Sequence, residues 1–518
     1  MSNQLVKSTF VLTIATLLSK ILGSIFRIPL QNIAGDEVLG IFSLVYPVYM
    51  TALILSVAGI PIAISQLIAK ARTSGDQVEV RNIFLTASIL GALFGIVSFL
   101  LISGFSATIA EMLGGQKTRL SLIVVSLTLL IAPYMAVYRG FFQGYEDMRQ
   151  TAYSQVIEQL IRVVLIIGIA YYMVQLGYSN EKVSGGVMVG SSIGALISLI
   201  YLRILFKRSV FKPQVKSPYS LAIFKKTSKR ILVISLPICV GALTMALINV
   251  VDSLSIPFSL KWSDQTEEGI NYLYGLYGRG LSLVQIATVF STSIVLPLIP
   301  TISKSIAKKD IHTTNNLIEK SQRLGNLLSW PAALGLFSLT LPLNLALFTN
   351  MNGSSVLAII SLSSVFTALT VLGTGILQGL DRSRVAAFII VLGAIVKVGL
   401  NVLFIQYWGL IGAAVSTLVI YILLFIVNSI FIYKYTGVKF YSRATIVHAG
   451  SSILMGMIIG LPTLFLAVDE WSRVVALGYS LISMMVGGVI YFILIIRLKG
   501  ISNEEIGSIP GIKNILKK

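Results

Sequence analysis

The most constraining feature of this sequence is a series of long apolar runs that charged residues seldom interrupt. The run at 409–433, for example, contains no charged residue. About 20 apolar residues are enough for a helix to cross the hydrocarbon core of a bilayer. Lipid offers no partner to backbone N–H and C=O groups, so only helices and closed barrels span it. Because the apolar runs are continuous and do not alternate with polar residues, they predict helices.

The composition agrees with a chain that lies mostly in lipid. The mean hydropathy is +0.88 and only 12% of the residues are charged, against about a quarter in soluble proteins. We therefore predict an all-α integral membrane protein with about 14 transmembrane helices. The first run is long, contains Lys20 and Arg27 and lacks a clear cleavage site, so we interpret it as a span and not as a signal peptide. The predicted spans are 8–33, 39–68, 82–105, 119–141, 153–176, 183–206, 230–253, 273–300, 324–348, 355–379, 385–405, 409–433, 444–467 and 471–496.

The basic residues predict which way these spans face. With a cytoplasmic N-terminus, 29 of the 40 Lys and Arg fall in cytoplasmic segments and 5 in external loops, while the acidic residues divide evenly. This is the asymmetry that membrane proteins show. Both termini are therefore predicted to be cytoplasmic. The net charge of +20 is explained by this topology and by attraction to anionic lipids, and we expect no nucleic-acid partner.

An internal repeat organises the chain. GFFQGYEDMR at 140–149 returns as GILQGLDRSR at 375–384, an offset of 235 residues, and the same offset pairs Gly40 with Gly275. The repeat predicts two six-helix bundles in parallel orientation, an arrangement of transporters that carry substrate between their halves by alternating access. The predicted domains are 1–206 for the N-terminal bundle, 207–229 for a basic cytoplasmic linker, 230–433 for the C-terminal bundle, and 434–518 for two extra spans and a cytoplasmic tail.

The repeated motif falls at the predicted cytoplasmic ends of two spans. We interpret it as a helix terminus, with Arg149 or Arg384 held at the lipid headgroups; the alternative is a direct role in transport. The motif residues are Gly140, Gln143, Gly144, Gly375, Gln378 and Gly379.

Charged residues inside the spans are candidates for function, because a charge in mid-bilayer costs about 2.5–3.5 kcal/mol on insertion scales. Lys20 and Arg27 are seven residues apart, nearly two helical turns, so we expect them to share a face of the first span. Arg279 lies in the outer part of the eighth. If these two spans line the space between the halves, three cations meet there and favour an anion, to which Arg offers a planar fork. The alternative is that each cation bonds helix carbonyls or reaches the interface.

The other charges within spans have more ordinary interpretations. Glu158 and Arg162 are four residues apart and predict a structural ion pair. Asp252 lies near a span end, where it can reach water. Lys397 has no acidic neighbour in its own span and faces either the substrate cleft or a bundle core. We expect no metal, cofactor or enzymatic site, because neither ligand clusters nor catalytic sets stand out.

The sequence resembles a known family. LSKILGSIFR at 18–27, LYGRGLSLVQ at 276–285, and GILQGLDRSR with the later Lys397 and Asn401 are similar to the polysaccharide-transporter branch of the multidrug/oligosaccharidyl-lipid/polysaccharide flippase superfamily. The subgroup contains the stage V sporulation protein B type and the lipid II flippases. The resemblance implies transport of undecaprenyl-pyrophosphate-linked saccharides, with Ser19, Lys20, Arg27 and Arg279 at positions that bind substrate in such flippases.

This function carries several expectations. The chain is expected in the bacterial cytoplasmic membrane, acting as a monomer on a lipid-linked saccharide among membrane lipids, with cell-wall synthesis proteins as further partners. Two rival functions stay open. One is a multidrug or cation extruder of the same fold, which would show acidic residues inside the bundles. The other is a non-transporting scaffold for cell-wall or sporulation enzymes.

Overall fold

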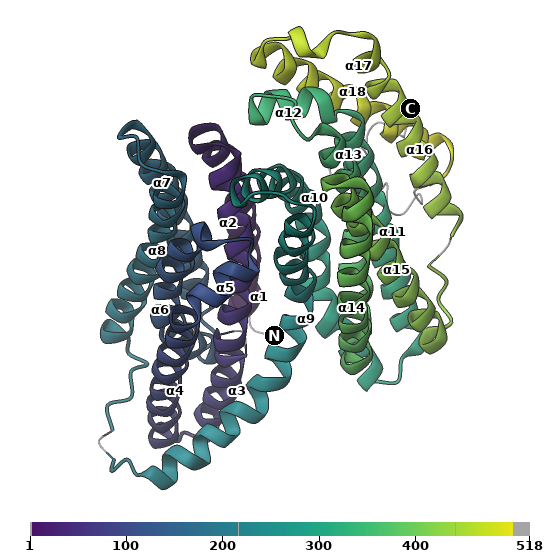
Figure 1. The fold of residues 1–518 in the computed structure, drawn as a ribbon. Coiled ribbons are helices and arrows are strands. Elements are labelled where there is room, and N and C mark those ends of the chain that lie inside the picture. The colour runs from purple at the N-terminus through teal and green to yellow at the C-terminus, as the bar shows by residue number, and fades with distance from the viewer. Residues whose placement is uncertain (1–2, 58, 216, 441, 501–518) are drawn as a thin grey trace. The chain divides into compact units, whose positions relative to one another are not determined.

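The computed structural model describes residues 3–500, apart from 58, 216 and 441, and within these residues the chain is helical with no strand (Figure 1). This confirms the predicted all-α class. The helices are α1 (Asn3–Ile25), α2 (Arg27–Val57), α3 (Ile60–Thr73), α4 (Gln77–Gly104), α5 (Ser106–Met112), α6 (Arg119–Gly144), α7 (Met148–Gln175), α8 (Asn180–Arg208), α9 (Leu221–Trp262), α10 (Glu267–Ala307), α11 (Ile311–Ser338), α12 (Thr340–Phe348), α13 (Ser354–Gly379), α14 (Ser383–Trp408), α15 (Leu410–Thr436), α16 (Arg443–Gly460), α17 (Pro462–Phe465) and α18 (Arg473–Arg497), with short 3₁₀ turns at Gln116–Thr118 and Val468–Glu470.

Many of these helices are long and apolar enough to cross a membrane. The described residues contain 11 such segments, or up to 13 if each of two bent helix pairs is one span. One of the 11, Val11–Thr73, covers most of the first predicted span and all of the second. The chain is thus a multi-pass membrane protein, as predicted. The count of 14 spans and the cytoplasmic termini remain predictions.

Three interruptions shape the helices. Gly35 in α2 has φ 81° and ψ 177°, a conformation that glycine adopts most readily, and lies between the first two predicted spans. The two parts of α9, Leu221–Leu243 and Ala246–Trp262, are bent by 51°. The bend between α11 and α12 is 77°, so the predicted span 324–348 follows two helix directions.

The chain divides into two compact units. The first unit contains residues 1–278 and 390–409, and the second contains 279–389 and 410–518. Helices α10 and α14 therefore each contribute to both units. The domain boundaries predicted from the repeat remain a prediction.

The core of the first unit has two apolar clusters. One joins α3, α4 and α6 and includes Ile64, Ile83 and Phe141. Aromatic rings extend it: Phe84 stacks on Phe206 with 4.5 Å between ring centroids. The other cluster joins α2, α5, α6, α7 and α8. This packing fixes the helices that carry the charged residues described below.

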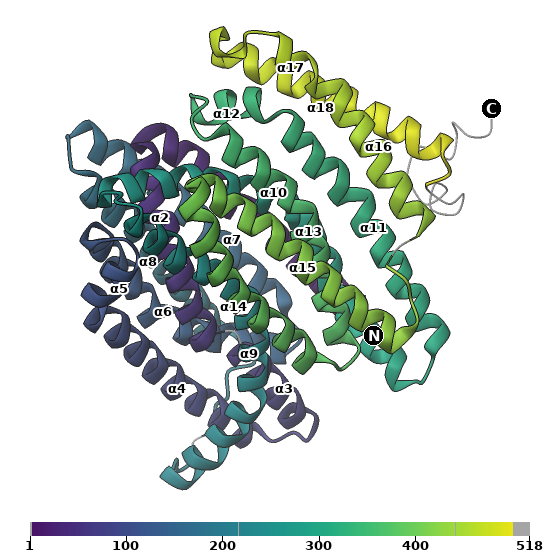
Figure 2. The ribbon, with the colours of Figure 1, turned by 45° about the vertical axis from the view of Figure 1, so that its right-hand side comes forward.

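In the second unit, the last helices dock against α11 and α12 (Figure 2). Leu339, Met455 and Ile495 belong to their shared apolar cluster. Two side chains of α18 also donate to backbone oxygens: Arg473 Nε to Ala346 O at 2.7 Å and the Tyr491 hydroxyl to Leu327 O at 2.9 Å. The two C-terminal spans are thus part of the second unit.

Candidate functional site

Arg27, at the start of α2, is a buried cation with aromatic neighbours. The side chain is only 3% exposed. The guanidinium carbon lies 5.8 Å from the Phe42 ring centre and 5.6 Å from that of Tyr46. Such cation–π contacts contribute about 0.5–2 kcal/mol. Among the described residues Arg27 forms no ion pair, so its positive charge is not cancelled by a carboxylate.

Polar atoms around Arg27 also lack partners. Within the described part of the chain, Arg27 Nε, the Gln31 Oε1 atom one turn later and the Tyr274 hydroxyl are buried without a hydrogen bond. Tyr274 belongs to α10 of the first unit and is close enough to interact electrostatically with Arg27. Buried polar groups without a partner are uncommon in folded proteins. A donor, an acceptor and a hydroxyl are therefore available to a ligand or to water.

Ser19 and Lys20 lie on α1, which ends at Ile25, one residue before Arg27. The Lys20 side chain is exposed, whereas the Ser19 hydroxyl is buried without a partner among the described residues. Helix α1 packs along α7, and Thr16 donates to Gln155 Oε1 at 3.3 Å. Since a turn at Phe26 separates α1 from α2, the spacing of seven residues alone does not place Lys20 and Arg27 on one continuous face.

Arg279 belongs to the second unit and anchors a turn. Its side chain is 1% exposed. Its Nη1 atom lies 2.9 Å from Asn344 Oδ1, 3.0 Å from Asn350 Oδ1 and 3.4 Å from Asn352 O, and its guanidinium stacks on Phe348. These residues form the end of α12 and the connection to α13. Sequence analysis provided no indication of this cradle, because its asparagines follow Arg279 only after 65 to 73 further positions in the chain.

Lys397 is fully buried in the first unit and has an acidic partner. Its Nζ atom lies 3.2 Å from Asp252 Oδ1. Asn401 Nδ2 donates to the same oxygen at 2.9 Å and to the Ser255 hydroxyl at 2.7 Å, while the Tyr277 hydroxyl donates to Asp252 Oδ2 at 3.0 Å. The expectation that Asp252 reaches water is therefore wrong: it lies inside α9 and is 2% exposed.

Glu158 joins two arginines in the first unit. Arg162 Nη2, one turn away on α7, lies 2.7 Å from Glu158 Oε1, and Arg139 Nη2 of α6 lies 2.8 Å from Oε2. Arg139 also donates to the Ser154 and Ser198 hydroxyls. Sequence analysis missed Arg139, because its position near the end of a predicted span gave no reason to expect a buried partner.

The repeated motif is found where helices pack closely. Helix α6 ends at Gly144 and α13 at Gly379. A Cβ added to Gly144 would lie 2.8 Å from Ile68 Cβ of α3, and one added to Gly379 would lie 3.0 Å from Ile302 Cβ of α10. The first glycines, Gly140 and Gly375, have equally close neighbours on the same two helices. In each copy of the motif, the glycines therefore allow two helices to pack more closely than residues with a side chain would. Among the described residues, no group of three or more His, Cys, Asp or Glu could hold a metal ion.

Comparisons with known proteins identify a family and several membrane proteins that this chain resembles. Residues 5–306 match the family model described as polysaccharide biosynthesis protein. The uncharacterized membrane protein YabM of Bacillus subtilis is 29% identical over 510 residues, covering 97% of this chain and 94% of that one. Lipid II flippase MurJ of the same organism is 25% identical over 521 residues, 95% of each. A solved structure of lipid II flippase MurJ, in an inward closed conformation, matches with a TM-score of 0.67 at 15% identity, covering 94% of this chain and all of that one.

Proposed function

Because the chain belongs to the polysaccharide biosynthesis protein family, matching its model over more than half of its length, we propose that it is a flippase for a lipid-linked saccharide. This membership confirms the resemblance that the sequence motifs indicated. The proposed cargo is an undecaprenyl-pyrophosphate-linked saccharide, either lipid II or a related polysaccharide precursor. The proposed route is alternating access across the cytoplasmic membrane, with no chemical change to the cargo.

The observation that carries this proposal is the unpaired, buried charge of Arg27. A pyrophosphate cannot cross hydrocarbon without groups that replace its hydration shell. The Arg27 guanidinium is already desolvated, lacks an ion pair in the described part of the chain and has Nε without an acceptor. A planar guanidinium binds two phosphate oxygens at once. We therefore propose Arg27 as the principal phosphate-binding residue.

The other cations contribute less than Arg27 to pyrophosphate binding in this proposal. Lys20 is exposed on α1 and would attract the pyrophosphate before it reaches Arg27. Arg279 is held through Nη1 by Asn344 and Asn350, so we propose that it assists by charge. Lys397 is less suited to bind cargo than the sequence suggested, since Asp252 neutralises it.

The charges oppose a cation extruder. Such a protein needs carboxylates that are free to bind a cation. Two carboxylates lie within the predicted spans, and both are paired. Glu158 is paired with Arg139 and Arg162, and Asp252 is paired with Lys397. A non-transporting scaffold would not require an unpaired buried arginine.

The test is translocation of lipid II in proteoliposomes. We expect Arg27→Ala to reduce transport at least about tenfold, because one charge-assisted hydrogen bond contributes about 1.5–3 kcal/mol, and Arg27→Ala/Arg279→Ala to abolish it. Arg203→Ala, which removes an exposed arginine of α8, is the matched control. Full transport by a well-folded double variant would overturn the role of these cations. Wild-type protein that moves a different lipid-linked glycan, and not lipid II, would correct the cargo while keeping the flippase.

A further inference from the structure

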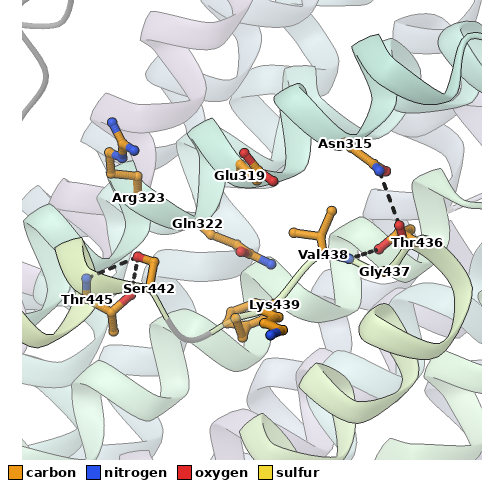
Figure 3. A pocket seen from close by; sticks show the side chains of 11 residues that line it. Asn315, Glu319, Gln322, Arg323, Thr436, Gly437, Val438, Lys439, Ser442 and Thr445 are labelled. Carbon is orange, nitrogen blue, oxygen red and sulfur yellow. Dashed lines mark hydrogen bonds between the residues drawn. The ribbon is translucent and has the colours of Figure 1, made fainter.

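A polar pocket lies in the second unit, and none of the residues of the proposed phosphate path lines it. It has a volume of about 420 Å³ and is bounded by the first half of α11, the end of α15 and the start of α16 (Figure 3). These segments carry cytoplasmic residues in the predicted topology. One water molecule accounts for roughly 30 Å³ of the liquid, so the pocket has room for a small polar molecule.

A buried amide without a partner points into this pocket. Gln322 of α11 is only 5% exposed, yet its Nε2 donor has no hydrogen-bond acceptor among the described residues. Figure 3 shows its amide directed from α11 toward Val438 and Lys439. Asn315, two turns earlier, donates to Thr436 O at 3.2 Å, while its own Oδ1 stays without a partner. Buried donors are normally satisfied, so the Gln322 donor indicates a ligand acceptor.

The surroundings of Gln322 favour a negatively charged acceptor. Lys439 and Arg323 line the pocket together with one carboxylate, Glu319. The N-terminus of α16 also faces it, and Ser442 caps this helix by accepting from Thr445 N at 3.3 Å. The backbone N–H groups of a helix N-terminus carry partial positive charge and bind phosphates in many proteins.

Glu319 limits the class of ligand further. A bare phosphate would gain from Lys439 and Gln322 but would leave this carboxylate unused. A phosphate ester whose remaining part bears hydroxyl or ammonium donors offers a partner both to the basic groups and to Glu319. The phosphate then binds Gln322, Lys439 and the start of α16, and the donors of the ester bind Glu319.

We propose that this pocket binds a phosphate ester with hydroxyl or ammonium donors, either the headgroup of a phospholipid or a soluble metabolite of the same chemistry. The ligand would connect α11 to α16, the helix that begins the first of the two C-terminal spans. The proposal does not depend on which cargo the protein carries.

The test measures binding of defined probes to the full-length protein. The soluble probes are glycerol phosphate and phosphoethanolamine, and their binding is measured by isothermal titration calorimetry in detergent. The lipid probes are phosphatidylglycerol and phosphatidylethanolamine, and their binding is measured by native mass spectrometry. We expect Lys439→Gln and Gln322→Glu each to weaken binding at least about tenfold. Gln322→Glu retains the side-chain shape but replaces the donor by a carboxylate. Lys434→Gln, an exposed charge on α15 that does not line the pocket, is the control.

The outcomes separate the two sources of ligand. Binding of the soluble probes alone identifies a metabolite site, and binding of the lipids alone identifies a headgroup site; either supports the proposal if both variants are impaired and the control is not. Equal binding by wild type and both variants, or no binding of any probe to wild type, overturns it. Unchanged thermal unfolding of the variants verifies that a lost signal reports the pocket and not the fold.

Discussion

Gly40 of α2 and Gly275 of α10, which the repeat aligns with each other, are in direct contact in the first unit. A Cβ added to Gly40 would lie 2.9 Å from Gly275 N and 2.8 Å from the carbonyl carbon of Asn271. A Cβ added to Gly275 would lie 2.7 Å from the carbonyl carbon of Asp36. The close neighbours are backbone atoms, which cannot move aside as a flexible side chain does.

Alanine at either glycine is therefore expected to destabilise the protein. Overpacking of a tight contact costs about 1–3 kcal/mol, occasionally more, so Gly40→Ala and Gly275→Ala should each lower the thermal unfolding temperature in detergent. Gly168→Ala is the control, because a Cβ there has no neighbour within 4 Å and alanine favours the helix. Wild-type stability of both variants would show that α2 and α10 do not cross so closely.

The Asp252–Lys397 pair yields a second prediction. Removing one member of a buried ion pair costs about 3–5 kcal/mol, because the other charge stays in a medium of low dielectric constant. Lys397→Met should therefore unfold more readily than wild type, and Lys397→Met/Asp252→Asn should regain most of the loss. The measurement is thermal unfolding of the set in one detergent. A double variant less stable than either single variant would contradict the pairing.

Glu158 provides a third prediction, because a single carboxylate holds Arg139 and Arg162. Glu158→Gln leaves the buried guanidinium of Arg162 and the partly buried one of Arg139 without their counter-ion and should cost about 3–5 kcal/mol. The comparison is Glu111→Gln, which breaks an exposed pair with Lys261; such pairs contribute about 0–1 kcal/mol. If both substitutions shift the unfolding temperature equally, the two arginines have other support.

The Arg279 cradle predicts a local effect. Arg279→Lys cannot reproduce the planar fork that contacts Asn344, Asn350 and the ring of Phe348. Faster hydrogen exchange is therefore expected for peptides spanning 344–354, with little change in α6 or α7. Exchange that accelerates throughout the chain would instead indicate global destabilisation, and unchanged exchange at 344–354 would remove the anchoring role.

Some of these features could be predicted from sequence and others could not. The apolar runs are sufficient to predict the all-α membrane fold, since only helices and closed barrels can span a bilayer. Glu158 and Arg162 are near in sequence, so helix geometry suggests their contact. Lys397 and Asp252 are 145 residues apart, and only the packing of α9 against α14 reveals the pair. The 77° bend after Ser338 falls three residues before Pro342, which indicates a break inside the predicted span but not the direction in which the chain then runs. Gln322 resembles any polar helix residue until its environment is known.

The attachment of α18 has an evolutionary consequence. Arg473 and Tyr491 bind the main-chain oxygens of Ala346 and Leu327, and every residue type carries such an oxygen. Substitutions at positions 346 and 327 therefore leave both acceptors in place, provided that the helices keep their course. Related sequences are free to diverge at these positions while the C-terminal helices stay docked. Correlated changes between aligned sequences should accordingly be weak at these two contacts, although the contacts themselves persist.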